Sequence, residues 1–155
     1  MKPVLELQKI HKEFPGIVAN DQIDLTLNRG EVHTILGENG AGKSTLMNII
    51  SGLYVPDSGS IFLEGKPLFL KNPAQAIAHG VGMVHQHFML IPNHSVSENI
   101  ILGTPQAFRL KKSKVRQQIK ELGTRYGLVL NPDLRVQDLS VGEQQKVEIL
   151  KVLFR

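Results

Sequence analysis

Residues 37–45 of the chain read Gly37-Glu38-Asn39-Gly40-Ala41-Gly42-Lys43-Ser44-Thr45. A glycine, four further residues and then Gly-Lys-Ser form the pattern of a phosphate-binding loop. Glycine allows backbone angles and close approaches that a Cβ atom would prevent, so successive N–H groups can point at phosphate oxygens. The stretch predicts a site for a nucleoside triphosphate; the alternative is a glycine-rich turn that caps an ordinary helix.

The segments on either side match the strand and the helix that such a loop requires. Glu31–Leu36 reads as a short buried strand, and apolar residues recur at helical spacing after the loop until Gly52 and Pro56. The recurring residues are Leu46, Ile49, Ile50 and Leu53. The loop therefore lies in the context of strand, turn and helix that phosphate binding needs.

Backbone and side chains of the loop have separate expected roles. Lys43 is expected to bridge the terminal phosphates and to act in catalysis, and the Ser44 hydroxyl to bind Mg²⁺. Thr45 packs or bonds at the start of the helix. The nucleotide contacts are assigned to Gly37, Asn39, Gly40, Ala41, Gly42, Lys43, Ser44 and Thr45.

Composition describes one ordinary soluble domain. The chain has 155 residues, 41% of them hydrophobic and 21% charged, which excludes disordered and fibrous classes. It has no cysteine, so disulfides and thiolate metal sites are excluded. No apolar run resembles a signal peptide or approaches the roughly 18 residues of a membrane span, so we expect a cytoplasmic protein whose membrane role needs a partner.

Positive charge is concentrated between residues 109 and 125, where seven lysines and arginines face one glutamate, while the whole chain carries +4. Val115, Ile119, Leu122 and Tyr126 recur there at helical spacing, which predicts an amphipathic helix. We interpret its basic face as solvated. Binding of nucleic acid or of anionic lipid head groups is the alternative.

The remaining pattern predicts a small sheet before and after the glycine loop. The expected strands are Leu5–Gln8, Asp24–Asn28 and a hairpin over residues 60–68 that turns at Gly65. A turn is expected at residues 28–30 and a short helix over residues 73–79. Val81–His85 is a second candidate core strand, and it runs directly into Gln86.

From residue 95 onward the pattern becomes helical. Ser95-Val96-Ser97-Glu98 is a capping box, and a second box, Ser140-Val141-Gly142-Glu143, opens a helix with an apolar face. The pattern changes from strand-like to helical near residues 86–105, and Gly103-Thr104-Pro105 is a sequence that interrupts regular structure. This change predicts a boundary between subdomains. We assign residues 1–92 to a nucleotide-binding core with its antiparallel β subdomain, and residues 93–155 to a helical subdomain.

The order of three motifs resembles the ATP-binding subunit of ABC transporters: the loop at 37–45, Gln86 after a strand, and Leu139–Gln144 opening a helix. The resemblance implies an α/β fold, with a P-loop NTPase core, that binds ATP and Mg²⁺. It also implies that Ser140 and Gly142 belong to the signature loop, which meets the γ-phosphate of ATP held by a second copy. The commonest signature is Leu-Ser-Gly-Gly-Gln, from which this chain departs at Val141 and Glu143. The Glu143 carboxylate would lie near an incoming phosphate, which is tolerable only if it folds back into the capping box or forms hydrogen bonds elsewhere.

The same resemblance assigns roles outside these loops. Gln86 matches the glutamine that reaches Mg²⁺ and the attacking water, and Phe14 lies where the family carries an aromatic that stacks on adenine. Phe14 could equally anchor the small sheet. Phe88–Ile91 is an apolar run that forms a partner surface for the permease if exposed, or else packs under the helices. His79, His85, His87 and His94 are expected to be polar surface rather than metal ligands.

The family's Walker B strand, catalytic glutamate and switch histidine follow the signature, so we expect an N-terminal portion truncated before the Walker B strand. Such a portion would bind ATP but hydrolyse little of it. The residue sequences of Gly82–Leu90 and Leu139–Lys151 resemble those of bacterial simple-sugar or nucleoside importers.

That subfamily implies four features. They are a permease subunit that contacts Gln86–Ile91, a second ATPase domain, a solute-binding protein acting indirectly, and a peripheral place on the cytoplasmic face of the membrane without direct nucleic-acid binding. The rival functions are a soluble ABC-type ATPase acting on nucleic acid or ribosomes, and a nucleotide-binding module that does not hydrolyse.

Overall fold

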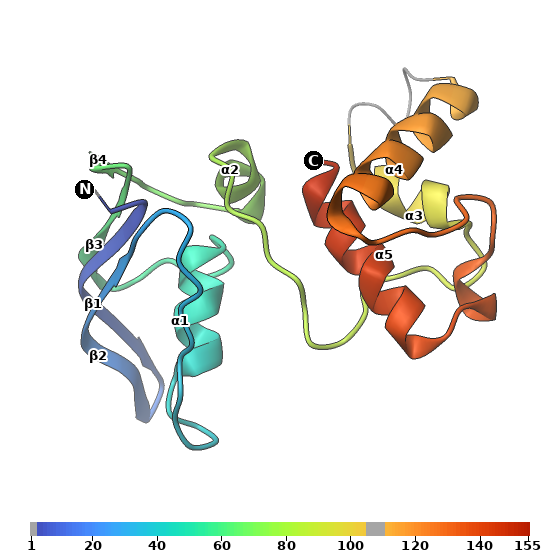
Figure 1. Ribbon diagram of the computed structural model, residues 1–155. Coiled ribbons are helices and arrows are strands. Elements are labelled where there is room, and N and C mark those ends of the chain that lie inside the picture. The colour runs from blue at the N-terminus through green and yellow to red at the C-terminus, as the bar shows by residue number, and fades with distance from the viewer. Residues whose placement is uncertain (1–2, 105–110) are drawn as a thin grey trace. The chain divides into compact units, whose positions relative to one another are not determined.

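The computed structural model describes residues 3–104 and 111–155 of the chain. The chain forms two compact units, Met1–Val81 and Gly82–Arg155 (Figure 1). Pro105 and Arg109, which entered the sequence predictions, lie outside the described residues. The division into a core of residues 1–92 and a helical subdomain of residues 93–155 stays a prediction.

The first unit contains a four-stranded antiparallel sheet of order β2-β1-β3-β4. Its strands are β1 (Leu5–Phe14), β2 (Ile17–Leu27), β3 (Ser58–Leu63) and β4 (Lys66–Pro67). Pro15 and Gly16 form the turn between β1 and β2, and Gly65 lies in the turn between β3 and β4. The predicted strands near residues 5, 24 and 60 are confirmed.

One face of this sheet is covered by helix α1 (Lys43–Ile50), and α2 (Pro73–Ala78) adds to the same core. Leu46 and Ile49, three residues apart on α1, are buried with Leu7 and Ile10 of β1. Each fully buried Leu or Ile side chain contributes about 1.5–3 kcal/mol relative to an exposed one. The apolar face of α1 therefore fixes the helix, and with it the loop before it, to the sheet.

Two predicted core strands are not formed. Glu31–Leu36 and residues 81–85 have no strand partner in the described parts of the chain, and Val32 and Leu36 are 94% and 88% exposed. A buried parallel strand is stable only where neighbouring strands satisfy its backbone and helices cover its faces. Apolar composition alone predicted these strands, and composition does not supply the partners.

The second unit is built from helices α3 (Val96–Ile101), α4 (Lys112–Tyr126) and α5 (Val141–Leu153), with a short 3₁₀ turn, η2 (Val136–Asp138), before α5. Their buried residues form one cluster: Val96, Ile100, Val115, Ile119, Val136, Leu139, Val147 and Leu150. The predicted amphipathic helix is confirmed as α4. Within residues 3–104 and 111–155, no helix has the length and apolar character to cross a membrane.

Both predicted capping boxes are formed. Ser95 accepts from the Glu98 N–H at 3.2 Å and donates its own N–H to the Glu98 carboxylate at 2.9 Å. At α5 the Glu143 carboxylate accepts from the Ser140 N–H at 2.9 Å and from the Ser140 hydroxyl at 2.7 Å. These hydrogen bonds lower the pKa of both glutamates. The largest contribution comes from the Ser95 N–H at Glu98 and from the Ser140 hydroxyl at Glu143.

The lowered pKa values make the boxes sensitive to acid. A group whose pKa is lower in the folded chain contributes stability above its unfolded pKa, and that contribution disappears as pH falls through the folded value. We expect the double variant Glu98→Gln/Glu143→Gln to be less stable than the wild type at pH 7. The difference should shrink as pH falls below the ordinary glutamate pKa of 4.5, as measured by urea unfolding at several pH values. A difference that is independent of pH would contradict this account.

Candidate nucleotide site

Helix α1 begins without a side-chain cap, unlike α3 and α5. Its N-cap is Gly42, none of the described side chains caps its first N–H groups, and its first turn has no acidic residue. The first N–H groups of a helix lack partners within the helix, and the helix dipole is positive at this end. The start of α1 can therefore bind an anion without displacing a side chain of its own.

Contact with strand β2 fixes the end of the glycine loop. Gly42 has φ of 80°, and a Cβ atom at Gly42 would lie 1.9 Å from the Ala19 carbonyl oxygen. The Asn20 side-chain amide also donates to the Gly42 carbonyl at 3.2 Å, and Asn20 is only 5% exposed. Only glycine fits between β2 and the first turn of α1.

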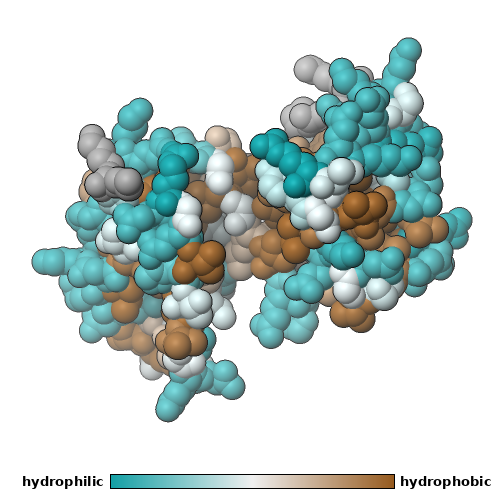
Figure 2. All heavy atoms as spheres, viewed as in Figure 1, coloured by the Kyte–Doolittle hydropathy of each residue, from teal (hydrophilic) through white to brown (hydrophobic). Residues whose placement is uncertain are grey.

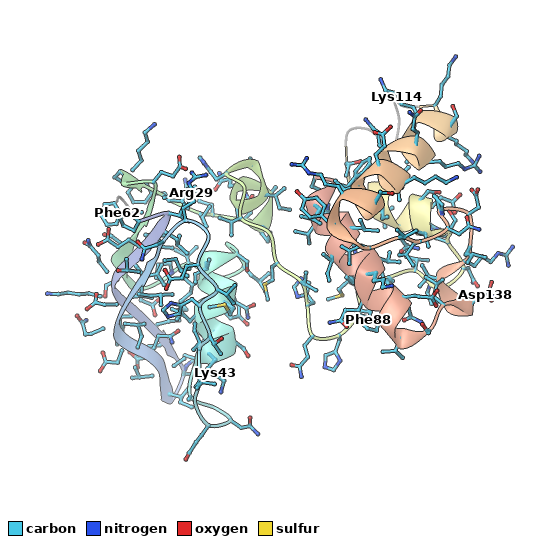
Figure 3. All side chains as sticks on the ribbon, in the orientation of Figure 1. Arg29, Lys43, Phe62, Phe88, Lys114 and Asp138 are labelled. Atoms are coloured by element: carbon cyan, nitrogen blue, oxygen red, sulfur yellow. The ribbon has the colours of Figure 1, made fainter. Side chains whose placement is uncertain are left out.

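The Lys43 side chain folds back over the loop. Its Nζ donates to the Gly37 and Glu38 carbonyls, both at 2.6 Å. An ammonium group has three donors, so two hydrogen bonds hold it in place and one donor remains. Figure 3 shows Lys43 at the N-terminal end of α1, where the uncapped N–H groups also lie.

The other residues assigned to the nucleotide contacts lie in the glycine loop and the first turn of α1. Asn39 and Ala41 are exposed, and Gly40 has φ of 87°. Ser44 is exposed at the start of α1, while Thr45 is half-buried. A hydroxyl oxygen is a donor that Mg²⁺ accepts, so Ser44 fits the predicted ligand. Across the described residues, no three histidine, aspartate or glutamate side chains gather closely enough to hold a metal ion.

Phe14 ends β1 and is half-buried. Its ring packs edge-on against Tyr54, with centroids 5.5 Å apart, and Lys12 Nζ lies 5.5 Å from its centroid. The contact with Tyr54 agrees with a role as an anchor of the sheet. Adenine stacking on the remaining surface stays a prediction.

The predicted residues Gln86, Ser140 and Gly142 belong to the second unit. Gln86 is exposed, and Ser140 and Gly142 are exposed at the start of α5. Glu143 is folded back onto Ser140 in the capping box, and the assignment of Ser140 and Gly142 to a signature loop stays a prediction. The Ser140 hydroxyl donates to that carboxylate, so it is held in a fixed orientation.

The apolar run Phe88–Ile91 has both packed and exposed side chains. Leu90 packs against the helical core, whereas Met89 and Ile91 are 62% and 37% exposed. Phe88 is half-buried and lies beside α5 in Figure 3. The run is therefore anchored to the helices and also presents exposed apolar side chains, and its contact with a permease stays a prediction.

The basic residues of α4 lie on an exposed face. Lys112, Lys114 and Lys120 are exposed, and Arg116 pairs with Asp133 at 2.6 Å. Figure 2 shows mainly hydrophilic side chains over the part of this unit that contains α4. This agrees with a solvated face.

Sequence reasoning missed several residues. Asn20 is a buried polar residue in a strand, and Asn99 and Glu148 are buried polar residues on helices, only 1% and 3% exposed. The sequence does contain a signal for Asn20, because a side-chain amide at an inward-facing position of a strand needs a hydrogen-bond partner. That partner, Gly42, lies 22 residues further along the chain.

Comparison with known proteins decides the family. The sequence matches the ABC transporter family over residues 20–155, which is most of the chain. The chain belongs to the ABC transporter family. Similar ABC proteins include the guanosine import ATP-binding protein NupO of Bacillus subtilis, 50% identical over all of this chain and 31% of its own length. The ribose import ATP-binding protein RbsA 1 of Rubrobacter xylanophilus is 45% identical over 99% of this chain and 31% of its own length.

Solved ABC cassettes share the fold. The ADP conformation of MJ1267, an ATP-binding cassette of an ABC transporter, gives a TM-score of 0.85 at 27% identity, over 99% of this chain and 65% of that one. The cbiO1 cassette of Clostridium perfringens gives 0.81 at 28% identity, over 99% of this chain and 62% of that one. The chain spans about a third of the length of these import proteins and less than two thirds of these cassettes.

Substitution of the loop glycines tests this geometry. Gly40 and Gly42 both have positive φ, but only a Cβ at Gly42 meets the backbone of β2. Gly40→Ala should cost about 1–2 kcal/mol of backbone strain. Gly42→Ala should in addition displace β2 or the loop and weaken MgATP binding by more than about tenfold, measured by calorimetry and thermal unfolding. Equal effects at the two glycines would exclude the contact with Ala19 as the cause.

Proposed function

We propose that the chain is the nucleotide-binding part of an ATP-hydrolysing subunit of an ABC importer. The observation that supports this most directly is the uncapped start of α1, with the Lys43 ammonium held beside it by the Gly37 and Glu38 carbonyls. The N–H groups of the loop would bind phosphate oxygens and Lys43 would neutralise their charge. Phe14 would stack on the adenine ring.

Mg²⁺, when bound, would neutralise charge on the terminal phosphates. Ser44 and Gln86 are the residues of this chain proposed to hold it, through a hydroxyl and an amide oxygen. Gln86 would also orient the attacking water, and Lys43 would stabilise charge on the transferred phosphoryl group. We further propose that residues 1–155 alone bind MgATP and hydrolyse it slowly.

A second ATPase domain would complete the site. Ser140 and Gly142 at the exposed start of α5 would meet the γ-phosphate bound to the other copy, because a helix N-terminus stabilises an anion. A dimeric structure of the ABC cassette MJ0796 has a TM-score of 0.76 with this chain at 27% identity, which supports pairing of such domains.

The transported solute is proposed to be a nucleoside or a simple sugar, since the similar proteins include guanosine, nucleoside and ribose import proteins. The permease would contact Gln86–Ile91, where Met89 and Ile91 are exposed, and a solute-binding protein would act indirectly. This assigns the protein to the cytoplasmic face of the membrane, peripherally. The predicted division at residues 1–92 and 93–155 then separates the core from the helical subdomain.

Lys43→Ala tests nucleotide binding. Loss of the ammonium removes the charge beside the phosphate site, so affinity for MgATP should fall at least about tenfold, or ~1.4 kcal/mol, in calorimetry. The matched control is Lys66→Ala, which removes an exposed lysine of β4 and should leave affinity unchanged. Equal affinity in wild type and Lys43→Ala would reject the site.

Gly142→Ala tests the contact with a second copy. Apart from its own helical turn, none of the described residues comes within 4 Å of a Cβ atom placed on Gly142, and φ there is not positive, so the helix should be as stable or up to about 1 kcal/mol more stable. In the whole protein, however, the added methyl group should lower ATP turnover several-fold by obstructing the γ-phosphate. Val141→Ala, in the same turn and 71% exposed in the wild type, is the control. Unchanged turnover in Gly142→Ala would contradict the proposed role of the signature.

A further inference from the structure

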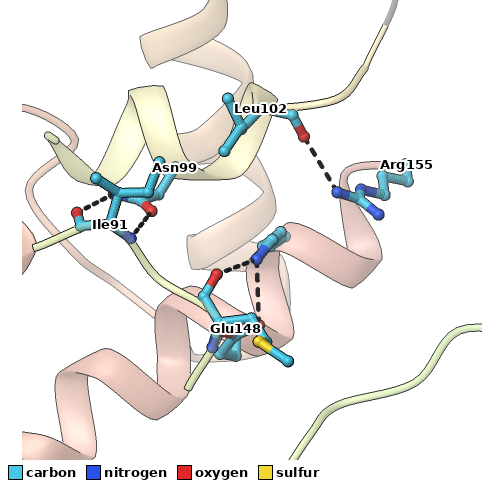
Figure 4. Close-up of polar contacts among 7 residues, drawn as sticks. Ile91, Asn99, Leu102, Glu148 and Arg155 are labelled. Atoms are coloured by element: carbon cyan, nitrogen blue, oxygen red, sulfur yellow. Dashed lines mark hydrogen bonds and ion pairs between the residues drawn. The ribbon is translucent and has the colours of Figure 1, made fainter. Parts of the chain in front are cut away.

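Two side chains of α5 hold both backbone polar groups of Met89. The Met89 N–H donates to Glu148 Oε1 at 2.6 Å, and Lys151 Nζ donates to the Met89 carbonyl at 2.8 Å. Glu148 and Lys151 are three residues apart and share one face of the helix, with 3.6 Å between their charged atoms. The two side chains satisfy the loop backbone as a neighbouring strand would, and Figure 4 shows polar contacts around Glu148.

The contact is buried at its α5 side. The side chains of Glu148 and Lys151 are only 3% and 13% exposed. A carboxylate that loses its hydrogen-bond partners while it stays buried is costly, so this contact resists opening. Movement of Met89 away from α5 is therefore opposed, and the loop and the helix tend to move together.

A second contact holds the same segment two residues later. The Ile91 N–H donates to Asn99 Oδ1 at 2.8 Å, and Asn99 Nδ2 donates to the Ile91 carbonyl at 3.0 Å. Asn99 is 1% exposed on α3. Between the two contacts Leu90 packs into the helical core, while the side chains of Met89 and Ile91 remain exposed.

We propose that Glu148 and Lys151 are positioning residues that link the loop after Gln86 to the signature end of α5. Met89 lies three residues after Gln86, and Glu148 lies eight residues after Ser140, about 12 Å along the helix. A displacement imposed on the exposed side of Met89 is then carried through α5 to Ser140. This inference rests on the proposed function, in which the permease contacts Gln86–Ile91 and Ser140 meets nucleotide on a second copy.

The first test measures the link itself, by amide hydrogen exchange at Met89 in the whole protein. Glu148→Ala removes the acceptor of this N–H and should speed its exchange at least about tenfold, whereas Glu148→Gln retains an acceptor oxygen and should have a smaller effect. Lys146→Met changes another lysine of α5, for which no hydrogen bond to Met89 is formed, and should leave the rate unchanged. Wild-type exchange in Glu148→Ala would overturn the proposal.

The second test measures coupling between the permease and ATP turnover. ATP turnover is measured for the whole protein bound to its permease in proteoliposomes and for the whole protein alone, and the first rate is divided by the second. Glu148→Ala and Lys151→Met should lower this ratio at least about threefold while MgATP affinity stays within about twofold of wild type, and Glu148→Gln should restore much of it. Should Glu148→Ala fail to fold, Lys151→Met decides the outcome. An unchanged ratio in a folded variant that has lost the Met89 contact overturns the proposal.

The outcomes also separate this inference from the function on which it rests. If the wild type and Lys43→Ala bind MgATP equally, the proposed function fails, whatever the exchange rate at Met89. If Lys43→Ala abolishes binding and the Glu148 and Lys151 variants couple as well as wild type, only the link fails.

Discussion

The first unit depends on the close contact between strand β2 and the last glycine of the loop. Gly42 lies so near the Ala19 carbonyl that any side chain would collide with it, and the Asn20 amide fixes the Gly42 carbonyl. The burial of Leu46 and Ile49 holds α1 against the sheet from the other side. The sheet is therefore a rigid support for the start of α1, where the uncapped N–H groups lie and where we propose that phosphate binds.

In the second unit, side chains hold the loops and helix starts in place, whereas in the first unit a close backbone contact does so. Capping boxes at Ser95 and Ser140 define where α3 and α5 begin, and Asn99 and Glu148 hold an extended segment against those two helices. The match to the ABC transporter family covers residues 20–155, so it includes residues of both units. The exposed Met89 side chain and the exposed start of α5 are then two ends of one connected structure.

Features set by neighbouring residues could be predicted from the sequence, and features set by distant partners could not. The glycine loop and both capping boxes depend on a few consecutive residues, so their patterns were sufficient. The expected strand at Glu31–Leu36 was wrong because a parallel strand needs partners that its own residues do not reveal. The contact of Glu148 with Met89 joins residues 59 apart, and no local pattern indicates it.

The folded position of Lys43 has an energetic consequence for ligand capture. A free lysine side chain has on the order of 2 kcal/mol of rotational entropy to lose when it is immobilised. Here the Gly37 and Glu38 carbonyls already restrict that freedom. An arriving polyanion would thus meet a cation that is largely ordered in advance, and a greater share of the electrostatic attraction would remain as affinity.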